Sequence, residues 1–524
     1  MVPDQSEIVR TAQRYDAIPY VSIPDRAHHP ARLCAVARLY GLEPVLPSRS
    51  RVLEIGCASG GHLIPLAAAF PEALFTGIDI SPVQIAGAQF RAARHGLENI
   101  EFTVKSFTDL QPRDGMFDYI ICHGVYSWVS EELSEKLLQA CGMCLAPGGI
   151  AAVSYNVLPG WRMLQALRDS ALFHTASAPS HEVRMAAARH LFSTISEHAD
   201  QGRAYGHMWR EIADQFLQLP DAYHAHDLFG DPNRPVTFTG FARAASGHGL
   251  AHLADADFKA NFPEAAGEAA GSAIRELSGG GNYAAEQYLD IMTGRTFRRS
   301  LLVHERTALA ADRSLPDGRI DTIYLGAPEE ATLSQVAGTD SWRFGSQKHR
   351  FITIHDMATV DALQRLLQRR PAFRNLASLL PVSQPDAGFH QHLRNSFMEL
   401  LRQGMLDLSA EPLPCAHAVP EFPKIWRLAL KDARDGLERT ATQLHSVYHM
   451  SSQARLLLSL ADGSRSREAL AGALFERLAS GSATVALAGN PVTDEETLLE
   501  IAQTTVDREL AAYLSAGLLL EDQG

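Results

Sequence analysis

A glycine-rich loop after an apolar run is the first stretch whose residue spacing indicates chemistry. It reads Glu54-Ile-Gly56-Cys-Ala58-Ser-Gly60-Gly61. Glycine adopts positive φ and lets a ligand approach the main chain where the next helix begins. Gly56, Ala58 and Gly61 almost satisfy the G-x-G-x-x-G pattern of dinucleotide sites. Taken alone, the loop is compatible with a dinucleotide, with S-adenosylmethionine, or with a tight turn that binds nothing.

Two acidic residues distinguish between these ligands. Glu54 lies two residues before Gly56, where a carboxylate pairs with the ammonium group of S-adenosylmethionine but repels a pyrophosphate. Asp79 ends the next apolar run, 25 residues beyond Glu54, and is placed to contact a ribose, which both ligands contain. We therefore expect S-adenosylmethionine to contact the residues Glu54, Gly56, Ala58, Gly60, Asp79 and Ile80.

Two later stretches carry polar and aromatic residues at predicted strand ends, where open parallel sheets bind ligands. They are His123-Gly-Val-Tyr126-Ser-Trp128 and Tyr155-Asn156. Methyl transfer depends on alignment of the acceptor with the methyl group, and a lysine acceptor must arrive uncharged, which desolvation favours. We expect His123, Tyr126, Tyr155 and Asn156 on the acceptor side, with Trp128 against the cofactor or the acceptor. The alternatives are a structural histidine and rings that pack the next helix.

Two further aromatic residues flank this region. Tyr20, in IPYVS, is predicted to close over the cofactor as part of an N-terminal lid. Trp161 lies on an apolar helical stripe and is predicted to belong to the core.

Strand-like and helix-like segments alternate between residues 50 and 155. The strand-like runs are 51–56, 74–80, 100–107, 117–125 and 148–156. Nearly continuous apolar strands that alternate with helices predict a parallel sheet covered on both faces. The 49 residues before this unit are expected to form a cap.

The rest of the chain has a different pattern. Residues 161–220 are predicted to be helical, as is AAEQYLDIMTGRTFRRSLLVH (284–304), whereas RIDTIYLG and HRFITIHD are predicted strands. LLRQGMLDL and YLSAGLLLE both run from a helix end through a glycine into an apolar strand, which indicates a winged-helix-like unit. Its last helix is expected to bury Leu499, Ala502, Val506 and Leu510.

Taken together, VLEIGCASGG, FTGIDIS, FDYIICHGVYSWV and LAPGGIAAVSYNVLPGW resemble the class I S-adenosylmethionine-dependent methyltransferases. The resemblance is narrower to a bacterial branch that is fused to a methyltransferase regulatory domain and includes protein-lysine methyltransferases of outer-membrane proteins. PYVSIPDRAHHPARL and residues 221–258, 286–304 and 448–470 extend it over most of the chain. It implies a methyltransferase whose acceptor is a protein lysine or a small molecule.

The chain departs from this family at two points. Ala58 replaces the middle glycine of the loop, a small change that should tolerate the ligand. Ser106 stands where many relatives carry an acid beside the adenine; Phe107 is expected to pack against the ring, and Asp109 is an alternative acid.

The predicted fold class is α/β. It comprises a Rossmann-like class I methyltransferase domain with an N-terminal cap, a mainly helical regulatory domain, a strand-containing connecting region and a winged-helix-like C-terminal domain, with bounds of 1–205, 206–305, 306–375 and 376–524.

Composition excludes several classes of protein. The net charge of -13 argues against broad contact with nucleic acid and favours an interaction role for the winged-helix-like unit. We expect a cytoplasmic enzyme, because no secretory signal and no apolar run of about 18 residues is present. The six cysteines form no disulfide framework. Metal binding is not expected, because the histidines considered (181, 190, 198, 207, 224 and 226) lack zinc-site spacing.

Two other hypotheses remain open. The chain is alternatively a catalytically silent S-adenosylmethionine-binding protein that recruits a partner, or an NAD-linked oxidoreductase. The regulatory and C-terminal units also offer surfaces for a homodimer.

Overall fold

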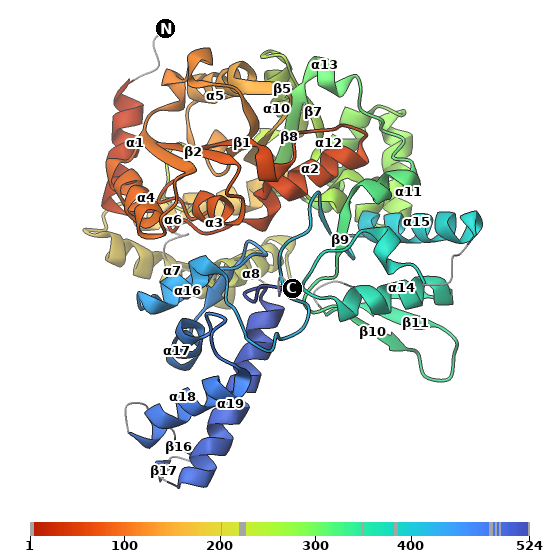
Figure 1. Ribbon diagram of the computed structural model, residues 1–524. Helices are drawn as coiled ribbons and strands as arrows, with labels where there is room; N and C mark the ends of the chain where they lie inside the picture. The colour runs from red at the N-terminus through yellow and green to blue at the C-terminus, as the bar shows by residue number, and fades with distance from the viewer. Residues whose placement is uncertain are drawn as a thin grey trace.

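The computed structural model describes residues 5–200, 202–218, 227–347, 350–381, 386–480, 486–487, 490–491 and 494–521. Its central feature is one large sheet (Figure 1). The strands are β1 (Arg51–Ile55), β2 (Leu74–Asp79), β3 (Ile100–Val104), β4 (Phe117–Cys122), β5 (Leu145–Leu158), β6 (Val236–Thr237), β7 (Leu250–Asp255) and β8 (Phe297–His304). They lie in the order β3-β2-β1-β4-β5-β8-β7, with β6 beside the end of β5. β1 to β5 are parallel, whereas β8 runs antiparallel to both β5 and β7.

Helices cover both faces of the sheet, as the continuous apolar strands predict. One face packs against α2 (Pro30–Leu39), α3 (Leu63–Ala69) and α4 (Pro82–Arg94), and the other against α5 (Glu131–Cys144) and α10 (Phe238–Ser246). Alternation along each strand explains this arrangement: Val52 of β1 belongs to the first core, whereas Leu53 and Ile55 belong to the second.

Local sequence sets the start of α4, which follows β2. Ser81 accepts a hydrogen bond from the backbone of Gln84, and Pro82 occupies the first turn, where a missing N–H costs nothing. The remaining N-terminal helix, α1 (Gln5–Ala17), lies beside α4.

The sheet continues across the predicted domain boundary after residue 205. β7 and β8 lie in the predicted regulatory region, which also holds α11 (Glu268–Ser278) and α12 (Asn282–Thr293), yet both strands belong to the central sheet. The predicted helix over 284–304 was wrong in its second half, because α12 ends at Thr293 and β8 follows. Arg298 explains the error: this charged residue is fully buried in β8, and its Nε donates to Asp290 at 2.8 Å.

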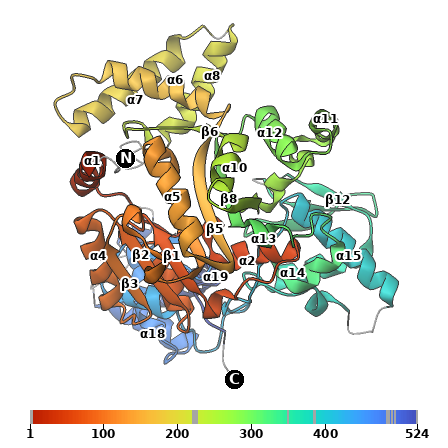
Figure 2. The same cartoon turned by 90° about the horizontal axis from the view of Figure 1, so that it is seen from above.

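Three helices form an arm beside the sheet. α6 (Trp161–His174), α7 (His181–His198) and α8 (Ala204–Leu217) pack around Leu167, Phe192 and Trp209, and Figure 2 shows them at one edge of the molecule. They confirm the predicted helical character after Trp161.

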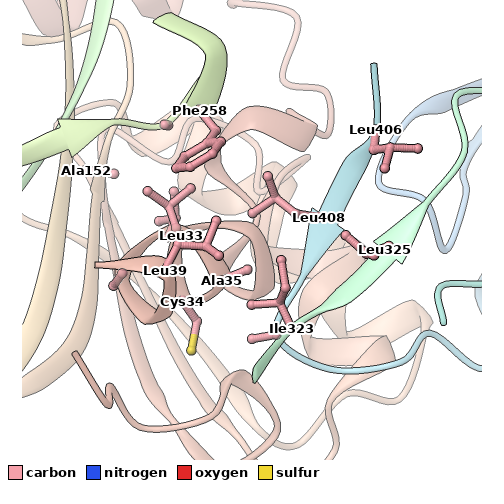
Figure 3. Close-up of a cluster of buried hydrophobic side chains, with 14 of the residues drawn as sticks. Leu33, Cys34, Ala35, Leu39, Ala152, Phe258, Ile323, Leu325, Leu406 and Leu408 are labelled. Atoms are coloured by element: carbon pink, nitrogen blue, oxygen red, sulfur yellow. The ribbon is translucent and has the colours of Figure 1, made fainter. Parts of the chain in front are cut away.

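The connecting region packs on α2. Its elements are α13 (Glu305–Ala308), β9 (Tyr324–Gly326), β10 (Thr332–Gln335), β11 (Trp342–Gly345), β12 (Ile352–Ile354), α14 (Met357–Gln368), α15 (Ala387–Arg402) and β13 (Asp407–Ser409). β9 and β13 pair as an antiparallel ribbon, and Figure 3 shows Leu408 and Ile323 in the same cluster as Leu33 of α2. The predicted strands in this region are therefore present.

The C-terminal unit holds α16 (Arg427–Arg434), β14 (Arg439–Ala441), β15 (Val447–His449), α17 (Ser452–Leu460), α18 (Arg467–Ala479), β16 (Ala486–Leu487), β17 (Asn490–Pro491) and α19 (Glu495–Ser515). α19 buries Ala502, Val506 and Leu510 as expected, but Leu498 takes the buried position predicted for Leu499, which is 40% exposed. Among the described residues, no helix is both long and apolar enough to cross a membrane.

Candidate functional site

A cavity of about 760 Å³ lies at the carboxyl ends of the parallel strands. Ten of the fourteen residues predicted for the site line it: Tyr20, Glu54, Gly56, Ala58, Asp79, Ile80, Phe107, His123, Trp128 and Asn156. They come from five successive strand ends and from the N-terminal segment, as expected for an open α/β sheet. Trp161 is half-buried at this cavity rather than in the core, and its indole N–H donates to Asn233.

The glycine loop is shaped by its hydrogen bonds to β2. Gly56 has φ of +76°, Ala58 has φ of +46° and Gly60 has φ of +73°, so the loop passes three times through the left-handed region. The Asp79 carboxylate accepts the backbone N–H of Ala58 at 2.9 Å and that of Ser81 at 2.9 Å. Asp79 therefore holds the loop in shape in addition to lining the cavity.

Glu54 presents an unsatisfied acceptor to the cavity. Its side chain is buried, and no described residue hydrogen-bonds its Oε2. Burial raises the pKa of Glu54 well above its usual value, and the carboxylates of Asp79 and Asp25 add to the effect. A buried carboxylate oxygen without a partner fits the ammonium group of S-adenosylmethionine.

Four predicted site residues do not line the cavity. A Cβ on Gly60 would lie 2.6 Å from the ring of Phe102, so this glycine serves close packing. Ser106 caps the short helix at Phe107–Asp109 by accepting the N–H of Thr108.

The other two are Tyr126 and Tyr155, which belong to the core beneath α10. The Tyr155 ring stacks on Phe241 at a centroid distance of 4.0 Å, and its hydroxyl bonds Ser300. Tyr126 contacts the same Phe241 edge-on. Both rings thus support the floor of the site from the face opposite the cavity.

The cavity also holds Asp25 and His28, which sequence reasoning missed, beside the predicted His123. Asp25 and His28 lie in the N-terminal segment, and the His28 Nδ1 is 2.6 Å from a carboxylate oxygen of Asp25. The His28 and His123 rings are 4.6 Å apart. Burial alone would raise the pKa of Asp25, but the hydrogen bond with His28 and the nearby His123 and Arg299 hold it below its usual range. The i, i+3 spacing of Asp25 and His28 in PDRAHH was an available signal.

His123 has a different environment. Its Nδ1 lies 3.0 Å from the Ser154 hydroxyl, which also accepts the N–H of Gly124. Burial lowers the pKa of His123 to about 3, with His28 as a further cause. His123 is therefore neutral at physiological pH.

Asp25, His28 and His123 are also the described residues that come nearest to a metal site. One donor atom from each lies within 4.8 Å of the others, a grouping absent from the histidines considered in the sequence. Asp25 and His28 already satisfy one another across 2.6 Å, so this pair is complete without an ion. His224 and His226 lie outside the described residues.

Comparisons with known proteins cover three parts of the chain. Residues 52–149 match the model of a methyltransferase domain, residues 220–304 that of a predicted methyltransferase regulatory domain, and residues 421–518 that of a PKMT C-terminal winged helix domain. The regulatory match spans β7 and β8, so this region completes the central sheet.

Two Rickettsia prowazekii proteins and one solved structure are similar to this chain in sequence or in fold. The uncharacterised protein RP789 of Rickettsia prowazekii is 28% identical over 97% of this chain and 93% of its own length. RP028 of the same organism is 32% identical over 44% of this chain and 93% of its own length. The structure of PKMT2 from Rickettsia typhi in complex with AdoHcy superposes with a TM-score of 0.85 at 25% identity, over 96% of this chain and 100% of that one.

Proposed function

We propose that this chain transfers methyl groups to lysine side chains of a protein. The chain belongs to the class I S-adenosylmethionine-dependent methyltransferases with a regulatory domain and a C-terminal winged helix. The full-length likeness to the Rickettsia PKMT2 supports a protein substrate. The observation that carries the lysine assignment is the pair of half-buried Asp25 and buried His28 beside aromatic walls in the cofactor cavity. A lysine ammonium needs an acceptor for its proton and a surrounding that disfavours its charge.

Glu54 and its neighbours are proposed to bind the cofactor. When bound, S-adenosylmethionine supplies an electrophilic methyl carbon. The unpartnered oxygen of Glu54 accepts the ammonium group, and Asp79 with Ile80 faces the ribose. Phe107 packs against the adenine, while Tyr20 and Trp128 close the cavity around the ligand. Gly56 and Ala58 leave room for it because neither carries a large side chain.

His28 is the better proton acceptor of the two histidines. Its Nδ1–H donates to Asp25, which leaves Nε2 as an acceptor that no described residue hydrogen-bonds. The Asp25 carboxylate stabilises the imidazolium that forms, whereas His123 has no carboxylate bonded to its ring. His28 Nε2 would take a proton from the lysine Nζ, and the freed electron pair would attack the methyl carbon that bound S-adenosylmethionine would supply, with the electron pair of the carbon–sulfur bond left on sulfur. Asn156, whose Nδ2 lacks a partner among the described residues, orients the acceptor with His123.

Transfer of labelled methyl groups tests this function. The purified chain is incubated with methyl-labelled S-adenosylmethionine and a bacterial lysate, and labelled proteins are mapped by mass spectrometry. We expect label on lysine side chains. A Gly56→Arg variant is the control, since even a Cβ at Gly56 would lie 2.7 Å from Val125.

Three results would contradict the proposal. Label found only on small molecules would overturn the protein acceptor. No label above the Gly56→Arg control, despite binding of S-adenosylhomocysteine in calorimetry, would favour the silent binder. Binding of NAD instead of S-adenosylhomocysteine would favour the oxidoreductase.

A further inference from the structure

The turn between β14 and β15 of the C-terminal unit reaches the cofactor cavity. His445, Ser446 and Val447 line it beside residues of the N-terminal segment and the glycine loop. His445 is 3% exposed. The methyltransferase domain therefore covers His445 in this turn.

His445 contacts that domain through His62, the residue that follows the glycine loop. Its Nε2 lies 2.8 Å from the Nδ1 of His62, across 383 residues of sequence. The same His62 nitrogen accepts the backbone N–H of Asp25 at 3.3 Å. A nitrogen that accepts this N–H carries no proton, so His445 Nε2–H is the donor. The bonds thus run from the C-terminal turn through His62 to the segment that carries Asp25 and His28.

Ring packing reinforces this chain of hydrogen bonds. The His445 ring meets His62 edge-on at 4.5 Å and His29 edge-on at 5.1 Å between centroids. Burial lowers the pKa of His62 and of His29 to about 3, and that of His445 well below its usual value. All three rings are therefore neutral and pack without charge repulsion.

The backbone at His445 is strained, and its surroundings impose the strain. Its φ is +58°, a left-handed conformation that residues with a Cβ rarely adopt. The turn is held by Thr442, which donates its N–H to Ser446 and accepts that of His445, and by the Gln443 side chain, which donates to Gly517 at 3.1 Å. A strained non-glycine residue that persists at a ligand cavity is typical of a functional constraint.

We propose that the β14–β15 turn is a built-in wall of the cofactor cavity and that His445 is a positioning residue. By holding His62, it fixes the N-terminal segment over the glycine loop, so cofactor binding depends on the docked C-terminal unit. This role is independent of which acceptor receives the methyl group.

Two substitutions at one position separate positioning from folding. His445→Gly removes the side chain and also the left-handed strain, so the turn keeps its shape. His445→Gln retains an amide nitrogen at a reach similar to Nε2 and restores the donor to His62. His449→Gln is the matched control, because His449 is exposed on the same hairpin.

Calorimetric titration with S-adenosylhomocysteine is the main readout, with the unfolding midpoint measured alongside. We expect His445→Gly to raise the dissociation constant about tenfold, the effect of one lost hydrogen bond of about 1.4 kcal/mol, with an unchanged or higher unfolding midpoint. His445→Gln and His449→Gln should stay within about threefold of the unchanged chain. Amide hydrogen exchange over residues 20–28 should accelerate in His445→Gly alone.

Unaltered affinity and exchange in His445→Gly would overturn the proposal. The proposal would also be overturned if His445→Gly and His445→Gln lost affinity equally and their unfolding midpoints fell equally. His445 would then serve packing alone. Neither measurement needs a methyl acceptor, so the result can be interpreted even if the acceptor is not a protein lysine.

Discussion

At the residue scale, Glu54 links cofactor binding to pH. Burial, then Asp79 and Asp25, raise its pKa well above the usual 4.5, so the folded chain holds the neutral form to a higher pH than the unfolded chain does. The neutral form contributes its whole stabilisation at pH values below the pKa of Glu54 in the unfolded chain. This stabilisation is lost as pH rises through the pKa of Glu54 in the folded chain. Glu54→Gln keeps the side chain neutral at every pH, and we therefore expect a higher unfolding midpoint at pH 7.

The same substitution should weaken binding of S-adenosylhomocysteine. Loss of a charge-assisted hydrogen bond to the ammonium group lowers affinity by roughly 10–100-fold. In the unchanged chain the affinity, compared at pH 6 and pH 8, should be greater at the higher pH because a larger fraction of Glu54 is ionised there, and Glu54→Gln should remove this dependence. Calorimetry at both pH values measures it, with the exposed Glu135→Gln as control. A pH slope that persists in Glu54→Gln would contradict the assignment.

His28 gives a second prediction at this scale. His28→Gln removes the acceptor next to Asp25, and we expect the rate of methyl transfer at pH 7.5 to fall by about 10²-fold, a typical contribution of a general base. The deficit should narrow toward pH 9.5, because lysine then loses its proton to water more readily. Initial rates across this pH range measure the effect.

His392→Gln is the matched control for His28. His392 forms a surface pair with Asp356 at 2.8 Å, far from the cavity, and should leave the rate unchanged. If the purified chain contained one metal ion per molecule and the His28→Gln variant contained none, His28 would be a metal ligand and not a proton acceptor.

At the element scale, the sequence predicted β1 to β5 because each is an apolar run that ends in polar residues. β8 escaped prediction because its buried Arg298 is neutralised by Asp290 and Glu286 on α12, contacts that exist only after folding. The same distinction applies to the site. Glu54 and Asp79 are marked by their distance from the glycines, whereas Arg299 and His445 reach the cavity from distant elements without a local signal.

The continuity of the sheet predicts the behaviour of a shortened chain. A chain that ends at residue 205 loses β7 and β8, and six residues of β5, from Ala151 to Asn156, lose their partners on β8. The exposed edge would lie within an apolar core, so we expect aggregation and no cooperative thermal transition. Circular dichroism and gel filtration test this. A monomeric 1–205 chain that binds S-adenosylhomocysteine would show that the regulatory region is dispensable for the fold.

At the scale of the whole molecule, one cavity draws its walls from widely separated parts of the chain. The cap supplies Tyr20 to His28, the parallel strands supply the glycine loop and His123, β8 supplies Phe297 and Arg299, and the C-terminal unit supplies His445. The regulatory and winged-helix regions are therefore parts of one catalytic body. Their relative placement controls the shape of the site.

Docking of the C-terminal unit depends on Asp432. This buried carboxylate accepts from Arg94 of α4 at 2.7 Å, lies 3.2 Å from His95 and accepts the Thr440 hydroxyl at 2.8 Å. Asp432→Asn should destabilise the protein by about 2 kcal/mol, because the half-buried Arg94 loses the nearer of its two carboxylate partners. Asp435 is more exposed and lies 3.2 Å from the same arginine. Asp435→Asn should lower the free energy of unfolding by less than about 1 kcal/mol. Denaturant unfolding measures both.

The Asp432→Asn and Asp435→Asn variants also show whether docking of the C-terminal unit, as distinct from loss of a surface charge, affects cofactor binding. If Asp432 holds the β14–β15 turn in the cavity, Asp432→Asn should weaken binding of S-adenosylhomocysteine and accelerate hydrogen exchange at residues 442–447. Asp435→Asn should do neither. Bound S-adenosylhomocysteine should in turn slow exchange at that turn in the unchanged chain, since coupling between two sites is reciprocal. Equal affinities for the two variants would mean that the C-terminal unit docks without influence on the cofactor site.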